Sequence, residues 1–228
     1  MTLVTANSPD NPWKLLPIEP PYILPEDQSL ITDFNRSARE EHTIRLDIFP
    51  EPYLGTPDAP VVLLCLNPGF KERDIEQHRD AVFGRRSCEN LLHAPSPYPF
   101  YLLDPGIVRT HWWDHKLGFL IKHFGQNGPS IVARSVLCVE YFPYHSKKFK
   151  HGKHLLPSQQ YSFALLRRAI ERQAVILIMR AKKAWCEAVP ELENYRHCET
   201  ASSVQNPAIT PQNFPEMFEA AVEAIRSM

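Results

Sequence analysis

Three short apolar segments constrain the fold of this chain more than any other feature. They cover residues 61–66 (VVLLCL), 135–141 (SVLCVEY) and 174–179 (AVILIM). Uninterrupted apolar runs of this length, rich in β-branched residues, are typical of strands that are buried on both faces of a parallel sheet. They therefore predict a sheet that other elements cover on both sides.

The segments between these strands favour helices. We expect helices over residues 28–47, 72–82, 110–124, 158–173, 181–188 and 214–227, a loop over 85–105 and a fourth, weaker strand over 195–198. Strands that alternate with helices imply a mostly parallel sheet with helices on both faces. The predicted fold class is therefore α/β, a three-layer αβα sandwich with a central, mostly parallel four-stranded sheet.

Length and composition favour one globular domain. The 228 residues suit a single α/β domain over residues 28–228, and the segment 1–27, rich in Pro, Asn and Asp, predicts an extended N-terminal arm. The five cysteines form no CxxC pair, which argues against zinc ribbons and iron–sulfur clusters. No apolar run approaches membrane-spanning length, and the odd cysteine count without a signal peptide favours a cytoplasmic (intracellular) protein, which we expect to be a monomer.

Two loops at predicted strand ends are the candidate binding loops, because ligands of parallel sheets bind at the carboxyl ends of the strands. The first is Asn67-Pro68-Gly69-Phe70, a tight turn whose backbone N–H groups can face an anion or a carbonyl oxygen. The second is the segment 205–211, which contains Asn206-Pro207-Ala208. Each also has a plain structural interpretation, as a strand-to-helix turn or as a loop that caps the last helix.

At these two places the sequence resembles the uracil-DNA glycosylase superfamily, in its mismatch-specific and single-strand-selective branches. Those branches have a strand that ends in Asn-Pro-Gly and a later loop that reads His-Pro-Ser or Asn-Pro-Ser. Here Leu66 follows Cys65 where the branches have a Gly-apolar pair, and Ala208 replaces the serine. The resemblance spans roughly residues 55–228, and the order of the predicted elements agrees with it.

The resemblance implies roles for the first loop. Asn67 would position the attacking water or stabilise the oxocarbenium-like sugar. Because an amide cannot act as a general base, activity would depend on orientation and on stabilisation of the departing base. Phe70 would stack on an extruded base. The other residues expected to bind the base here are Leu66, Pro68 and Gly69.

The second loop would face the first across the cleft. There Asn206 would contact the leaving base or a phosphate, and together with Asn67 it is our candidate catalytic residue. The alanine at position 208 removes one phosphate ligand.

Glu140 stands where the family commonly has the Asn that recognises uracil. An ionised carboxylate only accepts hydrogen bonds, so it would repel O4 of uracil and favour an exocyclic amine such as cytosine N4. This predicts a cytosine-derived substrate. If burial protonates Glu140, the discrimination weakens. In the plain alternative Glu140 pairs with a nearby Arg or Lys.

A basic run follows the second long strand, in a chain whose net charge is −1. We expect either contact with the DNA phosphate backbone or an ordinary solvated loop. Its candidate phosphate-binding residues are Lys147, Lys148, Lys150 and Lys153. The spacing of His145, His151 and His154 lacks a carboxylate partner, so we expect no metal.

These observations lead to one hypothesis and two alternatives. The hypothesis is a monofunctional DNA glycosylase without a cofactor, which hydrolyses the N-glycosidic bond of a flipped uracil or modified, cytosine-derived base in base-excision DNA repair or defence. The first alternative is a non-catalytic binder of modified bases or nucleotides. The second is a hydrolase of free nucleosides or nucleotides.

Overall fold

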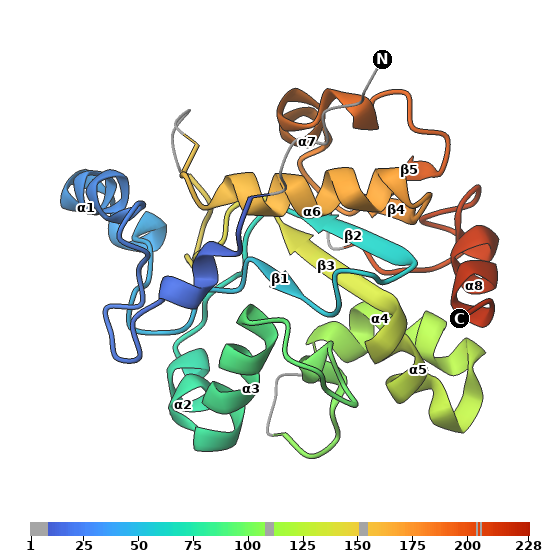
Figure 1. Cartoon of the computed structure of the whole chain (residues 1–228), viewed down its shortest axis with the longest axis horizontal. Helices are drawn as coiled ribbons and strands as arrows, with labels where there is room; N and C mark the ends of the chain where they lie inside the picture. Colours follow the sequence, from blue (N-terminus) through green and yellow to red (C-terminus); the bar gives the residue numbers. More distant parts are fainter. Residues whose placement is uncertain (1–8, 108–111, 151–154, 204, 206) are drawn as a thin grey trace.

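A single mixed sheet forms the centre of the computed structural model, which describes residues 9–107, 112–150, 155–203, 205 and 207–228 (Figure 1). The strand order is β1-β3-β2-β4-β5; the last four are parallel to one another, and β1 is antiparallel to β3. The strands are β1 (Tyr53–Leu54), β2 (Val61–Cys65), β3 (Val136–Glu140), β4 (Val175–Ile178) and β5 (Cys198–Thr200).

Three of the predicted strands form β2, β3 and β4. The fourth, predicted over residues 195–198, shares only Cys198 with β5, and the prediction of four strands in all is wrong by one. The additional strand, β1, pairs only Tyr53 with Val139 and Leu54 with Cys138. A two-residue strand contains no hydrophobic period, so sequence patterns do not detect it. Gly55 ends it at φ +109°, where a Cβ atom would lie 2.2 Å from the carbonyl oxygen of Val136. Only glycine allows this close approach.

Helices surround the sheet. The described residues contain eight α-helices and five short 3₁₀ helices. The α-helices are α1 (Gln28–Ser37), α2 (Arg73–Arg79), α3 (Ala81–Leu91), α4 (Trp112–His123), α5 (Gly128–Ser135), α6 (Gln159–Glu171), α7 (Lys182–Ala188) and α8 (Phe218–Arg226). The 3₁₀ helices are η1 (Pro12–Leu15), η2 (Glu40–His42), η3 (Tyr101–Leu103), η4 (Gly125–Asn127) and η5 (Pro190–Leu192).

One helix prediction and one loop prediction are wrong in extent. The helix expected over residues 28–47 ends at Ser37, because the side chain of Asn35 binds both the N–H and the C=O of Ile44 and turns the chain back. The loop expected over residues 85–105 begins instead with most of α3, which starts where the Asp80 side chain accepts a hydrogen bond from the N–H of Phe83. In both places a local side-chain cap decides the helix boundary.

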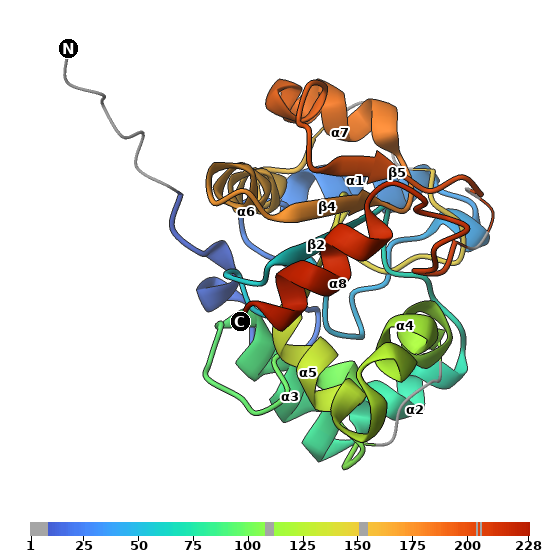
Figure 2. The same cartoon turned by 90° about the vertical axis from the view of Figure 1, so that its right-hand side faces the viewer.

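The two faces of the sheet contact different helices, as Figures 1 and 2 show. Val61 and Leu63 belong to a hydrophobic cluster with residues of α4, α5 and α8. Val62 and Leu64 belong to a second cluster with residues of α6 and α7. Alternation along β2 therefore sends successive side chains into two separate cores.

The described part of the N-terminal segment packs against the second cluster. Trp13 is 2% exposed, and its ring meets that of Tyr144 edge to face at 5.9 Å. The side chain of Asn11 donates to the carbonyl of Leu91 at 2.7 Å. None of the helices in the described ranges has the length and apolar character needed to cross a lipid bilayer.

Replacing Trp13 by Ala tests whether this segment stabilises the domain. We expect the free energy of unfolding to fall by about 3–5 kcal/mol, the usual cost of truncating a buried tryptophan. Urea denaturation measures it. The matched control is Leu15→Ala in the same 3₁₀ helix, because Leu15 is 70% exposed and should change stability by less than about 0.5 kcal/mol. Equal effects of the two changes would contradict the packing described here.

Candidate functional site

The carboxyl ends of β2 and β3 lie side by side and bring two predicted site residues to one edge. Cys65 pairs with Glu140 at the end of the parallel ladder. The two chains stay together beyond it, because the N–H of Phe142 donates to the carbonyl of Leu66 at 2.8 Å. The Asn67 turn and Glu140 therefore share this edge of the sheet.

Asn67 is tied to the segment that follows β3. Its amide nitrogen donates to the carbonyl of Pro68 at 2.9 Å and to Oγ of Ser146 at 3.2 Å. The N–H of Ser146 donates to the carbonyl of Pro68 at 3.4 Å. Because both amide hydrogens point into the protein, the acceptor Oδ1 is the group that Asn67 can present to a ligand.

The base-binding residues predicted beside Asn67 differ in accessibility. Gly69 is exposed and Leu66 is partly buried, whereas Pro68 and Phe70 are buried. The guanidinium carbon of Arg45 lies 4.1 Å from the centre of the Phe70 ring. This cation–π contact covers one face of the ring on which a base was expected to stack.

Glu140 is buried, and its Oε2 has no hydrogen-bond partner within the described part of the chain. Burial raises the pKa of Glu140 well above its ordinary value; Cys65 and Glu51 add to this rise and Arg180 opposes it. The neutral acid is therefore favoured, and it both donates and accepts. The predicted discrimination against uracil O4 depended on an ionised carboxylate and is weakened accordingly.

One cationic side chain, Arg180, interacts with this carboxyl group, and a second, Lys116, interacts with Arg180 and Cys65. Lys116 of α4 is 1% exposed, and burial, aided by Arg180, lowers its pKa to about 8 while Cys65 opposes the shift. Arg180 follows β4, and its N–H donates to the carbonyl of Leu64 at 3.2 Å. Sequence patterns did not indicate either residue, because a lysine in an amphipathic helix resembles any surface lysine.

The loop that contains Asn206 is anchored to the same region, although Asn206 itself lies outside the described residues. On one side the N–H of Ala201 donates to the carbonyl of Ile178 at 2.9 Å. On the other the N–H of Ile209 donates to the carbonyl of Lys116 at 2.8 Å. The two described ends of the loop thus attach to the carboxyl end of β4 and to the helix that bears Lys116.

Two of the four predicted phosphate-binding lysines are paired with carboxylates. Lys147 lies 2.9 Å from a carboxylate oxygen of Glu72 and 3.2 Å from one of Glu40. Lys148 lies 2.6 Å from Glu41. Lys150 is exposed, and Lys153 falls outside the described ranges. Contact with a phosphate backbone would have to replace these ion pairs.

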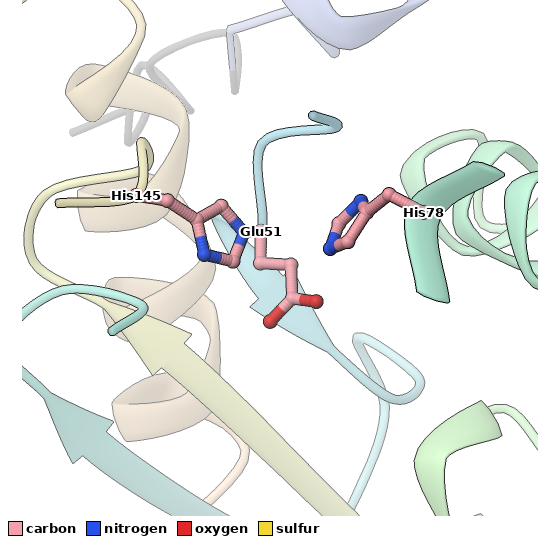
Figure 3. Close-up of side chains that lie close together, drawn as sticks. All are labelled: Glu51, His78 and His145. Atoms are coloured by element: carbon pink, nitrogen blue, oxygen red, sulfur yellow. The ribbon is translucent and has the colours of Figure 1, made fainter. Parts of the chain in front are cut away.

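A second cluster adjoins the Asn67 turn and was not predicted. One ligand-type atom each from Glu51, His78 and His145 lies within 4.8 Å of the other two, and Figure 3 shows the side chains pointing toward one another. Nδ1 of His145 donates to the carbonyl of Gly69 at 2.7 Å, which joins the cluster to the turn.

The parts of this cluster come from three separate places in the chain. Glu51 precedes β1, His78 lies in α2 and His145 follows β3. No short motif connects them, so only tertiary structure reveals the group. The sequence spacing groups His145 with His151 and His154 instead, and these two lie outside the described residues.

The hydrogen bonds in this cluster identify the protonated nitrogens. Because a carbonyl only accepts, Nδ1 of His145 bears the proton, and its Nε2 is buried without a hydrogen-bond partner in the described structure. The N–H of Phe49 donates to Nδ1 of His78 at 3.2 Å, so the proton of that neutral ring is on Nε2.

Burial, with a contribution from His145, lowers the pKa of His78 to about 2. Burial also raises the pKa of Glu51, whose Oε1 accepts a hydrogen bond from Tyr101 at 3.4 Å.

A cavity of about 300 Å³, which Tyr101 lines, is separate from the Asn67 turn and from the cluster of Glu51, His78 and His145. Its wall includes Gly55, Arg86, His93 and Tyr98. Asn67 and Glu140 do not line it, so it is not the predicted base pocket.

No protein-family model, curated protein or solved structure matches the chain. Its function therefore has to be inferred from the chemistry of the edge formed by β2 and β3.

The depressed pKa of His78 makes a prediction about acid stability. The unfolded chain binds a proton at this histidine below its ordinary pKa of 6.5, whereas the folded chain does so only near pH 2. The stability contribution is therefore complete above pH 6.5 and is lost as the pH falls through the interval between these values. His78→Asn keeps an acceptor for Phe49 and removes the titration, so the slope of unfolding free energy against pH should decrease by up to about 1.4 kcal/mol per pH unit. Urea denaturation from pH 4 to 8 measures it, and an unchanged slope would contradict the burial of a neutral ring.

Proposed function

We propose that this chain hydrolyses the N-glycosidic bond of a base swung out of a DNA strand, on a three-layer αβα fold of the uracil-DNA glycosylase type. The observation that supports this most is the meeting of the Asn67 turn and Glu140 at one edge of the sheet. This edge combines a polar turn, a buried acid and two cations, which are the groups that such a reaction needs.

The charge that develops in this reaction is on the departing base. Arg180 provides positive charge near Glu140, and Lys116 provides it beside Arg180 and Cys65; preorganised charges and donors stabilise such an anion strongly. Oδ1 of Asn67, the acceptor that the turn leaves for a ligand, stabilises the oxocarbenium-like sugar. In this mechanism Asn67 removes no proton.

A neutral Glu140 is complementary to more than one pyrimidine. Its O–H donates to O4 of uracil while its carbonyl oxygen accepts from N3–H. The same acid donates to N3 of cytosine and accepts from N4–H. The proposed substrate is therefore a flipped uracil or a modified cytosine, and other contacts must select between them.

The ion pairs of the basic run favour a second candidate, a hydrolase of free nucleosides or nucleotides. Phosphate contacts position a protein on DNA, and here Lys147 and Lys148 already bind Glu40, Glu72 and Glu41. A free nucleoside needs no such contacts. The two candidates share the same bond cleavage and differ in their dependence on salt.

Base release followed by alkaline cleavage tests the proposal. Duplex and single-stranded oligonucleotides that contain uracil, thymine mismatches or modified cytosines should give strand breaks at one class of base. Glu140→Gln retains a donor and an acceptor and should keep the rate within about 10-fold, whereas Glu140→Leu should lower it at least about 100-fold, as loss of a transition-state donor does. Binding without breaks would instead indicate a non-catalytic binder.

The stability of Glu140→Leu separates a functional from a structural role. Replacing a buried carboxyl group that lacks a partner by an apolar group of similar size should leave the unfolding free energy unchanged or raise it by about 1–3 kcal/mol. A variant that is at least as stable and yet inactive would assign Glu140 to the reaction. A less stable variant with full base release would contradict that role.

The salt dependence of binding distinguishes DNA from a free nucleoside. If DNA is the substrate, Lys150→Ala should lower the affinity for DNA. The slope of log affinity against log salt concentration should become shallower by about one released counterion. Lys183→Ala is the matched control, because Lys183 lies on α7 with its side chain 90% exposed. If the chain instead cleaves free nucleosides without salt dependence, the second candidate is correct.

A further inference from the structure

We propose that Glu51, His78 and His145 bind one water molecule and that His145 removes a proton from it to generate the nucleophile. The catalytic half of this inference rests on the proposed function, whereas the water site does not. The inference supplies the general base that Asn67 cannot be.

His145 provides an acceptor aimed into the cluster. The residue is 4% exposed, and the carbonyl of Gly69 fixes its proton on Nδ1. Nε2 is then a buried lone pair without a partner in the described part of the protein. Leaving such a group unpaired is unfavourable, and buried polar atoms without protein partners are usual sites of ordered water.

His78 provides a hydrogen-bond donor that points to the place that Nε2 of His145 faces. Phe49 donates to its Nδ1, so Nε2 bears the proton and faces Glu51 and His145 (Figure 3). The Glu51 carboxylate provides a second acceptor. One donor and two acceptors complement a single water, which accepts one hydrogen bond and donates two.

The hydrogen bond from Phe49 favours water over a metal ion. A separation of up to 4.8 Å between the ligand-type atoms fits either occupant, since two partners of one water lie about 4.6 Å apart and two zinc ligands about 3.4 Å apart. Nδ1 of His78 already accepts from the N–H of Phe49, so a metal on Nε2 would have to remove its proton and leave an imidazolate. A water accepts a hydrogen bond from that Nε2–H as it stands.

The proposed step is balanced without a cofactor. Nε2 of His145 takes a proton from the water, whose oxygen forms a bond to the anomeric carbon of the sugar. The N-glycosidic bond breaks, and its electron pair leaves with the base, whose negative charge the hydrogen bond from Glu140 stabilises. His145 then releases its proton to solvent, and the free base anion takes one from solvent. One water is consumed, and the free base and the sugar are the products.

The water site is tested without reference to activity. Nitrogen-15 NMR of the histidine side chains should show His145 protonated at Nδ1 and His78 at Nε2. Adding zinc chloride to the whole chain should leave both unchanged. Stoichiometric zinc binding that His145→Asn abolishes, or the opposite ring tautomers, would overturn the water site.

Single-turnover base release tests the catalytic half. His145→Asn keeps an N–H for the Gly69 carbonyl and lacks Nε2, so the rate should fall about 10²–10⁴-fold, and the limb of the pH profile that rises with deprotonation of the base should disappear. His42→Asn is the matched control, because Nδ1 of His42 also lies within hydrogen-bond distance of a backbone carbonyl, 3.0 Å from that of Lys148, but outside the cluster. It should retain the wild-type rate.

Two outcomes count against the catalytic role, and they can be told apart. If His145→Asn retains the wild-type rate and pH profile, His145 is not the base although the glycosylase function stands. If the wild-type chain releases no base from any substrate, the proposed function fails and the catalytic role fails with it. The NMR and zinc measurements then still decide the water site.

Discussion

The parallel pairing of β2 with β3 is the constraint on which the rest of the site depends. Its register joins Val61 to Val136 and Cys65 to Glu140, and the two chains remain hydrogen-bonded as they leave the sheet. A slip of one residue would turn the Glu140 side chain to the other face of the sheet. It would also turn each apolar side chain of the strand into the opposite hydrophobic cluster. Because both strands are buried throughout, such a slip is strongly disfavoured. The position of the Asn67 turn relative to Glu140 therefore follows from the packing of the core.

That edge retains polar groups which a purely structural core would exclude. Oε2 of Glu140 and Nε2 of His145 are buried without partners in the described chain, and each such atom costs about 1–3 kcal/mol. Elsewhere the same strands contribute only apolar side chains or thiols to the two hydrophobic clusters. Local violations of the rules for a stable core are expected at functional sites, where activity opposes stability. Eight side-chain atoms of the described residues are buried without a partner, and Oε2 of Glu140 and Nε2 of His145 are the two that belong to this edge and to the segment beside it.

The sequence predicted those parts of the fold that form apolar runs and those site residues that stand at the carboxyl end of a strand. Three of the parallel strands were predicted because each is an apolar run, and Asn67 and Glu140 because carboxyl ends of parallel strands share an edge. The fourth strand was expected over residues 195–198, which are not an apolar run, and it begins only at Cys198. β1 was missed because two residues have no period, and the ends of α1 and α3 because a single side chain, Asn35 or Asp80, decides them. Glu51, His78 and Lys116 were missed for a different reason. They come from elements outside the parallel strands, and only tertiary packing brings them together.

The asparagine at the end of β2 and the histidine after β3 have separate tasks in the proposed reaction. An Asp at position 67 would combine stabilisation of the sugar with proton removal, but its carboxylate would face the carbonyl of Pro68, which now accepts a hydrogen bond from the amide. Asn67 instead secures the turn, and the Gly69 carbonyl of that turn fixes the tautomer of His145. Because one backbone turn holds both side chains, a change in either should disturb the other. The β2–β3 pair therefore positions both Asn67 and His145, the residue that removes the proton in the proposed reaction.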